Sequence, residues 1–279
     1  MKVWTLYESA QESVEVFKPW GGERAQLIQT GFGPLDTAIG GIFPGSCAIL
    51  GGDTGIGKSS LILTSALGSN QSVGIISTED TPDVLGTRIL AARSGVDSLK
   101  IRKGTLSARE QKALKLAHEA LQDEKKVYVA YATSCNQDGV IEATRGLADK
   151  GCKLIWLDYI QKVRGKGDDR RNEVASTFTA FQRGCAAADA AGFAVSQFSR
   201  RTERDASAFP RRHWLKESGD LENEARLILL AWRDAKDRAV VHVTIDKSTV
   251  GGEGTTFSYK RDESGTLREL DQRFYEGDL

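Results

Sequence analysis

The chain has 279 residues, of which 40% are hydrophobic and five are proline, so it is long enough for one large or two small α/β domains with a real core. Its 38 basic residues balance its 38 acidic residues, which excludes a global attraction to nucleic acid or to an anionic membrane and leaves such binding to local clusters. The four cysteines form no Cys-x-x-Cys pair and no stretch reaches the ~18 apolar residues that span a bilayer, so we expect reduced cysteines in a soluble, intracellular protein.

The first 28 residues are expected to form an arm or linker ahead of the main domain. Acidic residues stand where a signal peptide would have its apolar core. Pro-Trp-Gly-Gly at 19–22 is a helix-breaking stretch. The residues before it have the loose apolar spacing of a short amphipathic helix, namely Val3, Leu6, Tyr7, Val14 and Phe17.

From residue 27 onward, apolar runs alternate with helical patterns. Strands are predicted at 46–50, 73–78, 127–132, 154–157, 193–196, 228–232, 240–245 and 255–260. Helices are predicted at 59–67, 82–92, 108–122, 138–149 and 173–191. Gly-Gly-Glu-Gly at 251–254 indicates a β-hairpin between the last two strands. The alternation predicts an α/β fold, a mostly parallel sheet with helices on both faces and a C-terminal β-hairpin.

A phosphate-binding loop lies between the first predicted strand and the first predicted helix. Gly-Asp-Thr-Gly-Ile-Gly-Lys-Ser at 52–59 fits the pattern G-x-x-x-x-G-K-[ST]. Its glycines let backbone N–H groups point at phosphate oxygens, Lys58 adds a charge at the β and γ phosphates, and the Ser59 hydroxyl can bind Mg²⁺. The candidate nucleotide-binding residues are therefore Gly52, Asp53, Thr54, Gly55, Ile56, Gly57, Lys58, Ser59 and Ser60.

Three further strands end in polar side chains at the edge of the sheet where open parallel sheets bind ligands. Asp158 ends an apolar strand and is the candidate second residue of a Mg²⁺ site, with Ser59. Glu79 ends another strand and is the candidate general base, with Asp80 as its local competitor. Gln197 ends a third strand and is a candidate sensor of the γ phosphate, the alternative being an ordinary polar strand end.

With these strand ends, the chain resembles the motor domain of the DnaB-type replicative helicases, in the RecA superfamily. The resemblance is carried by Thr-Gly-Phe-Gly-Pro-Leu-Asp at 30–36, Ser-Thr-Glu-Asp at 77–80, Asp-Tyr-Ile-Gln at 158–161, Ser-Gln-Phe-Ser-Arg at 196–200 and Leu-Lys-Glu-Ser-Gly-Asp-Leu-Glu at 215–222. It implies a RecA-like P-loop NTPase over residues 29–270 that uses ATP, or another nucleoside triphosphate, with Mg²⁺. It also implies a hexameric ring that moves on single-stranded DNA during replication, in the cytoplasm of a bacterium or of a phage-infected host.

The chain departs from that family in two places. The family carries a collar domain or a primase ahead of its motor, whereas only about 28 residues precede it here, which suggests a compact phage or mobile-element version. The family also ends its penultimate strand with Lys-x-Arg, a pair that reaches the γ phosphate of a neighbouring subunit. Here Lys247 is present, but Thr249 stands in place of the arginine. Either Lys247 acts alone, or Arg233 or Arg238 compensates, or hydrolysis is slow.

Two basic segments that follow strand ends are candidates for binding the DNA backbone. One is 162–171, with Arg164, Lys166 and Arg170, and the other begins at Arg200 and Arg201. The resemblance adds a backbone-tracking loop at Lys216, Glu217 and Gly219. The alternative is that these are solvated loops of mixed charge. The acidic residues 271–279 are expected to be a frayed tail, with docking to a replisome protein as the alternative.

Three functions stay open at this point. The leading one is an ATP-dependent, ring-forming replicative helicase. The second is a recombinase-like ATPase that forms filaments, which would share the phosphate loop and the basic loops. The third is an ATPase that regulates or loads a helicase and unwinds nothing, for which Thr249 is the best support.

Overall fold

The computed structural model describes residues 5–17, 27–123, 126–167, 169–199, 209–215 and 221–270. The strands are β1 (Cys47–Gly52), β2 (Val73–Ser77), β3 (Val127–Tyr131), β4 (Leu154–Asp158), β5 (Ala191–Gln197), β6 (Leu227–Arg233), β7 (Val240–Ser248), β8 (Thr256–Arg261) and β9 (Leu267–Glu269). The helices are α1 (Leu6–Phe17), α2 (Gly33–Ile39), α3 (Lys58–Gly68), α4 (Pro82–Ser94), α5 (Ser98–Lys103), α6 (Ala108–Asp123), α7 (Gln137–Ala148), α8 (Arg170–Ala187) and α9 (Leu221–Glu224), with 3₁₀ turns η1 (Ile160–Lys162) and η3 (Arg212–Trp214). None of the helices in this part of the chain combines the length and the apolar composition that crossing a bilayer requires.

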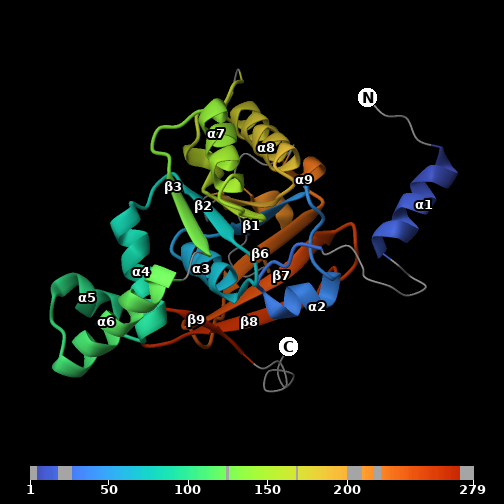
Figure 1. The fold of residues 1–279 in the computed structure, drawn as a ribbon. Helices are drawn as coiled ribbons and strands as arrows, with labels where there is room; N and C mark the ends of the chain where they lie inside the picture. Colours follow the sequence, from blue (N-terminus) through green and yellow to red (C-terminus); the bar gives the residue numbers. More distant parts are fainter. Residues whose placement is uncertain are drawn as a thin grey trace.

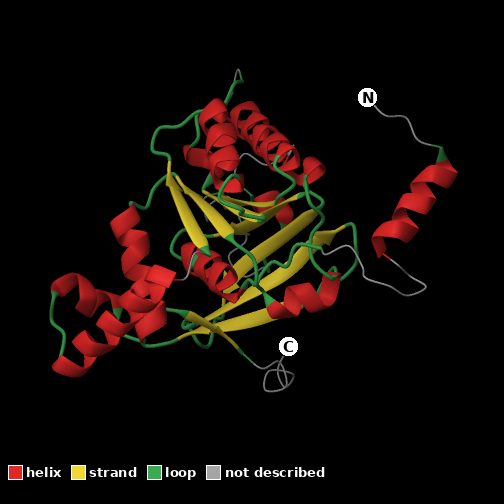
Figure 2. Ribbon diagram, viewed as in Figure 1, coloured by secondary structure: helices red, strands yellow, loops and turns green. Residues whose placement is uncertain are grey.

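The strands form one sheet in the order β3-β2-β4-β5-β1-β6-β7-β8-β9. In this spatial order, neighbouring strands pair in parallel from β3 through β2, β4, β5 and β1 to β6. The remaining strands, β7, β8 and β9, each pair antiparallel to the strand before them. Helices cover both faces of the sheet (Figures 1 and 2). The predicted fold class is therefore confirmed, including the hairpin that joins β7 to β8 through residues 251–254.

Alternate residues of the buried strands face opposite sides of the sheet, and this alternation builds two cores. Leu50 and Trp156 belong to the core under α2 and α3, whereas their neighbours Ile49 and Ile155 belong to the core under α7 and α8. Strands buried on both faces need a nearly continuous apolar sequence, so the apolar runs of the chain predicted these strands.

The helix that follows the phosphate loop is fixed to the centre of the sheet. Trp156 on β4 stacks on Phe193 of β5, with ring centroids 4.4 Å apart. Its indole Nε1 donates a hydrogen bond to Ser65 Oγ on α3 at 3.2 Å, and that hydroxyl in turn donates to the carbonyl of Thr30. The second half of α3 is thereby held against β4 and against the segment that precedes α2.

The predicted helix at 173–191 was wrong at its C-terminal end. Helix α8 ends at Ala187 and residue 191 already begins β5. Asp189 has a backbone φ of 50°, in the left-handed region, so the chain leaves the helix there despite its alanine-rich sequence.

Three short elements of the structure, α2, α5 and β9, were not predicted from the sequence. Helix α2 carries a proline in its first turn and has Gly40, in the left-handed conformation, as its C-cap. Helix α5 has Asp97 as its N-cap, and the Asp97 carboxylate accepts a hydrogen bond from the backbone N–H of Leu99. Both are ordinary helix-boundary signals that were readable in the sequence. Strand β9 has only three residues and owes its conformation to pairing with β8.

The predicted N-terminal helix is present as α1, and Figure 1 shows it standing clear of the sheet. Leu6 and Tyr7 on this helix are 91% and 75% exposed, so the body of the chain does not cover them. The predicted tail at 271–279 lies outside the described residues, and the division into arm, domain and tail stays a prediction.

Candidate active site

The phosphate-binding loop connects β1 to α3, as the sequence predicted. Gly55 and Gly57 have φ values of 78° and 114°, which side-chain-bearing residues rarely adopt, so the loop requires glycine there. Gly52 is confined by its surroundings instead, since a Cβ there would lie 3.1 Å from the carbonyl oxygen of Ala231. The loop ends at Gly57, which is the N-cap of α3.

Lys58 is buried and folds back over this loop. Its Nζ donates hydrogen bonds to the carbonyl oxygens of Gly52 at 3.0 Å and Asp53 at 2.8 Å. Burial lowers the pKa of Lys58 to about 8, and the carboxylates of Asp158, Asp53 and Glu79 oppose that shift. The ammonium group therefore lies among the acidic residues of the site, where a triphosphate would replace the carbonyls as its partner.

Ser59 and Asp158 come together, although they lie on different elements. Ser59 Oγ donates a hydrogen bond to Asp158 Oδ2 at 3.0 Å. Burial raises the pKa of Asp158 to about 6, partly offset by the hydrogen bond from Ser59. A carboxylate and a hydroxyl are oxygen donors of the kind that Mg²⁺ prefers, and Mg²⁺ commonly takes only one or two ligands from the protein. The pair therefore fits a magnesium ion that also binds the nucleotide.

The ends of β2 and β4 are tied to each other beside this pair. Thr78 Oγ1 donates to the carbonyl oxygen of Asp158 at 3.0 Å and accepts a hydrogen bond from the backbone N–H of Tyr159 at 3.1 Å. The peptide bond between Asp158 and Tyr159 is cis. The two hydrogen bonds of Thr78 hold the end of β4, which carries Asp158, against the end of β2, which leads into Glu79.

Glu79 and Asp80, the two candidates for the general base, differ in their partners. Asp80 Oδ2 accepts a hydrogen bond from Arg88 Nη1 at 2.6 Å, in an ion pair. The side chain of Glu79 is exposed at the end of β2, and within the described part of the chain its carboxylate makes no ion pair. The geometry therefore favours Glu79 as the acid that is available to a water molecule.

Gln197 is linked to the Asp-Tyr-Ile-Gln stretch by hydrogen bonds that the sequence did not predict. Its backbone N–H donates to Gln161 Oε1 at 3.3 Å, and Gln161 Nε2 donates to Ser196 Oγ at 2.8 Å. Burial and the carboxylates of Glu79 and Asp158 raise the pKa of the Tyr159 hydroxyl, and a hydrogen bond with the Gln197 side chain opposes that rise. Tyr159 thus lies between the acidic residues and Gln197.

Lys247 lies far from the phosphate loop of its own subunit. On β7 it is in register with Ile228, near the start of β6, while the loop follows Gly52, which is in register with Ala231 near the end of β6. Its Nζ donates to the carbonyl oxygen of Glu222 at 2.5 Å. Lys247 and the exposed Thr249 therefore belong to the opposite edge of the sheet from the nucleotide site.

Of the two arginines considered as substitutes for the missing one, only Arg233 contacts the phosphate loop. Its Nη2 donates to the carbonyl oxygens of Gly55 at 2.8 Å and Ile56 at 3.3 Å. The side chain of Arg238 is exposed, and its carbonyl oxygen accepts a hydrogen bond from Arg233 Nη1. A second loop-side arginine, Arg261, was missed because it lies in no motif and reaches the loop only through the fold.

The candidate DNA-binding residues are divided by the structure. Arg164 and Lys166 are exposed in the segment after η1. Arg170 is engaged within the subunit, because it donates to the carbonyl oxygen of Gln161 and pairs with Glu173. The other candidates lie outside the described residues, namely Arg200, Arg201, Lys216, Glu217 and Gly219.

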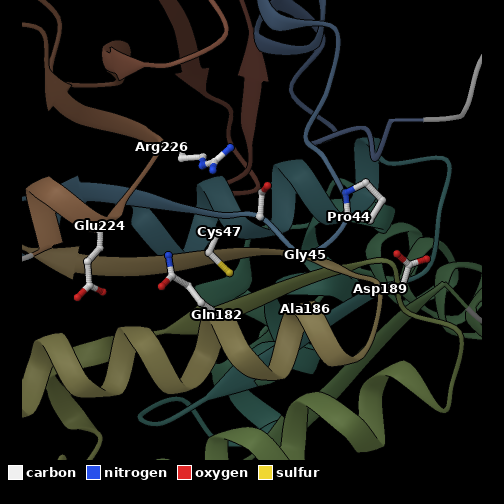
Figure 3. Close-up of a pocket in the computed structure, with 9 residues that line it drawn as sticks. Pro44, Gly45, Cys47, Gln182, Ala186, Asp189, Glu224 and Arg226 are labelled. Atoms are coloured by element: carbon white, nitrogen blue, oxygen red, sulfur yellow. The ribbon is translucent and has the colours of Figure 1, made fainter. Parts of the chain in front are cut away.

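A cavity of about 420 Å³ lies at the amino end of β1, beside α8 and the turn before β6 (Figure 3). Cys47, Gln182, Asp189 and Arg226 are among the residues that line it. Since the phosphate loop follows the carboxyl end of β1, this cavity is not part of the nucleotide site. Among the described residues there is also no cluster of three or more His, Cys, Asp and Glu side chains that could hold a metal ion.

Comparison with known proteins agrees with this geometry. The family model for the DnaB-like helicase C-terminal domain matches residues 28–263. The replicative DNA helicase DnaB of Geobacillus stearothermophilus is 24% identical over 266 residues, which cover 90% of this chain and 58% of that protein. The chain thus spans little more than half the length of this curated relative.

Two solved structures share the fold closely. The structure of a DnaB-like replicative helicase, reported with its interactions with primase, superposes with a TM-score of 0.83 at 19% identity, covering 97% of this chain and 68% of that one. The ATPase domain of G40P superposes with a TM-score of 0.80 at 20% identity, covering 95% of this chain and 96% of that one.

Proposed function

This chain belongs to the DnaB-like helicase C-terminal domain family, and on that basis we propose that it is the ATP-driven motor of a replicative DNA helicase. The observation that carries the proposal is the convergence of four groups at one edge of the sheet. Lys58 covers the phosphate loop, the Ser59 hydroxyl lies 3.0 Å from the Asp158 carboxylate, and Glu79 extends unpaired beside them within the described residues. This is the set of groups that nucleoside triphosphate hydrolysis requires.

In this proposal each residue has a separate task. Lys58 binds the β and γ phosphates, and Ser59 and Asp158 hold Mg²⁺, which would neutralise charge on those phosphates when it is bound. Glu79 accepts a proton from the attacking water at its carboxylate. Gln197 contacts the γ phosphate and transmits its loss through Gln161 and Tyr159 to the segment that follows η1.

The working unit is proposed to be a ring of subunits, with six as the family's number. Lys247 is too far from the loop of its own subunit to serve there, so its role in hydrolysis would be toward a neighbouring subunit. The exposed Arg164 and Lys166 are proposed to contact the backbone of single-stranded DNA inside the ring, together with Arg200, Arg201, Lys216, Glu217 and Gly219.

A strand-displacement assay tests this function. The protein with Mg²⁺ and ATP should separate a forked DNA duplex, and Lys58→Ala should abolish both separation and ATP hydrolysis. Lys260→Ala is the matched control, because that lysine is exposed on β8 and pairs with Asp237. ATP hydrolysis without any separation of the fork would favour the loading or regulatory ATPase, and open filaments seen by electron microscopy on single-stranded DNA would favour the recombinase-like one.

A further inference from the structure

Two arginines from the C-terminal half of the chain lie against the phosphate loop of the same subunit. Arg233, at the end of β6, donates to the carbonyls of Gly55 and Ile56. Arg261, at the end of β8, lies so close that a Cβ on Gly57 would come within 2.8 Å of its Nη2. Arg261 Nη1 also reaches Ser60 Oγ at 3.4 Å. Both guanidinium groups therefore flank the loop and the first turn of α3.

Neither guanidinium group has a carboxylate partner among the described residues. Arg261 donates to the carbonyl oxygen of Gly265 at 2.8 Å, and the remaining partner of Arg233 is the carbonyl oxygen of Arg238 at 3.1 Å. Burial lowers the pKa of Arg261, and the charges of Arg233 and Arg88 lower it further. Partly buried arginines usually pair with acids. Here the two guanidinium groups repel each other beside a phosphate loop. An anion bound between them and the loop would relieve that repulsion, so the pair is suited to binding an anion.

Both arginines are carried by ordered turns. Asp234 follows Arg233, and its Oδ1 accepts hydrogen bonds from the backbone N–H groups of Lys236 at 2.6 Å and of Asp237 at 2.7 Å. Asp262 follows Arg261, and its Oδ1 accepts from the backbone N–H of Thr266 at 3.0 Å. These bonds order the backbone that follows each arginine before a ligand binds, which lowers the entropy lost on binding.

The order of strands decides which end of the nucleotide these arginines face. The strands that carry Gln197, Asp158 and Glu79 lie on one side of β1, and β6 lies on the other. The γ phosphate belongs to the side of Glu79 and Gln197. Arg233 and Arg261 lie on the opposite side, and Ser60 is one position further along α3 than the metal-binding Ser59. That side is where the α phosphate and the ribose would lie.

Resting on the proposed nucleotide-hydrolysing function, we propose that Arg261, with Arg233 beside it, binds the α-phosphate end of the nucleotide within the same subunit. In this arrangement Arg233 exchanges the carbonyl oxygens of Gly55 and Ile56 for phosphate oxygens when the nucleotide enters, and Arg261 exchanges the Ser60 hydroxyl for the α phosphate. They set the affinity for nucleoside di- and triphosphates and leave the cleavage of the γ phosphate to Glu79 and to the neighbouring subunit.

Equilibrium binding of MgADP and of a non-hydrolysable MgATP analogue to the full chain tests this assignment. Arg261→Gln should weaken both nucleotides by the same factor, about ten-fold, because the α phosphate is common to them. Arg261→Lys should recover part of that loss of affinity. The control is Arg145→Gln, an exposed arginine in the last turn of α7 that lies outside the proposed site.

The outcomes separate the possible errors. Weaker binding of the triphosphate alone would place Arg261 at the γ phosphate and overturn the assignment, as would unchanged binding of both nucleotides. If the parent protein binds neither nucleotide, the proposed function fails before the arginines are tested. Should Arg261→Gln fail to fold, as judged by circular dichroism, Arg233→Gln carries the same test with the same expected equal loss.

Discussion

Ser59 Oγ and Asp158 Oδ2 are 3.0 Å apart, although they lie 99 positions apart in the chain. Strand β5 lies between β4, which ends at Asp158, and β1, which leads into the loop before Ser59. They meet because parallel strands end at the same edge of the sheet. Asp158 carries its carboxylate into a partly buried position, and its pKa is raised to about 6 there. This contact connects the stability of the protein to the magnesium site proposed for this pair.

We expect Asp158→Asn to stabilise the nucleotide-free protein at pH 7.5. An acid whose pKa is higher in the folded state favours folding fully below its unfolded value, and it loses that contribution as the pH rises through about 6. The ionised carboxylate therefore costs about 1–3 kcal/mol at neutral pH, and the amide removes this cost. Thermal unfolding should show a higher Tm, while Asp149→Asn, at an exposed helix end, leaves Tm unchanged. A lower Tm for Asp158→Asn would contradict this account.

Nucleotide affinity should be greatest between about pH 6 and pH 8. Below about 6, protonation of Asp158 removes a magnesium ligand, and above about 8 the loss of a proton from Lys58 removes the charge at the phosphates. Fluorescence anisotropy of a labelled nucleotide with Mg²⁺, measured across pH 5–9, would show the dependence of affinity on pH. It should have an acidic limb, where affinity falls below about pH 6, and an alkaline limb, where affinity falls above about pH 8. Asp158→Asn should remove the acidic limb and keep the alkaline one. An affinity that does not change with pH would show that neither group controls binding.

Glu79→Gln should lower the hydrolysis rate by about 10²–10⁴-fold and leave nucleotide binding nearly unchanged, because the amide cannot accept the proton of the attacking water. Asp80→Asn is the matched variant, one residue along. It breaks the ion pair with Arg88, which is partly exposed, so it should cost at most ~1 kcal/mol of stability and little activity. The reverse pattern of losses would assign the base to Asp80.

Lys247→Ala should abolish DNA-stimulated hydrolysis and leave nucleotide binding nearly intact. The position of Lys247 at the far edge of the sheet gives this prediction a complementation test. Subunits with Lys58→Ala lack the phosphate-binding lysine but supply Lys247, and subunits with Lys247→Ala do the opposite. Mixed assemblies should recover part of the activity that each variant lacks alone. Turnover by Lys247→Ala equal to that of the parent protein would remove Lys247 from the reaction.

The sheet and the phosphate loop were predictable because their signals are local in the sequence. Buried parallel strands are apolar without interruption, and the loop is a contiguous pattern of eight residues that opens a helix. Asp158 and Glu79 could be placed at the same edge of the sheet because each lies at or just after a strand end, while their roles stay predictions. The end of α8 was missed because Ala-rich sequence suits a helix, whereas the turn at Asp189 and the pairing of β5 decided the outcome.

The remaining parts of the site depend on residues that only the fold brings near. Arg88 distinguishes Asp80 from Glu79 by an ion pair across the β2–α4 connection, and no motif contains it. Arg233 lies 178 positions from Gly55 and Arg261 lies 201 positions from Ser60, so only the fold brings these arginines to the loop. The roles of the DNA-binding residues stay predictions, and five of them lie outside the described part of the chain.

The placement of the phosphate loop and Lys247 at opposite edges of one sheet makes the subunit a directional building block. Contacts between such blocks join unlike surfaces head to tail, so each contact would complete one reaction site and leave a vacant half-site at each free end. A closed assembly has as many complete sites as subunits, an open one has one fewer, and a lone subunit has none. The specific activity would then rise with protein concentration as single subunits, which have no complete site, join into assemblies.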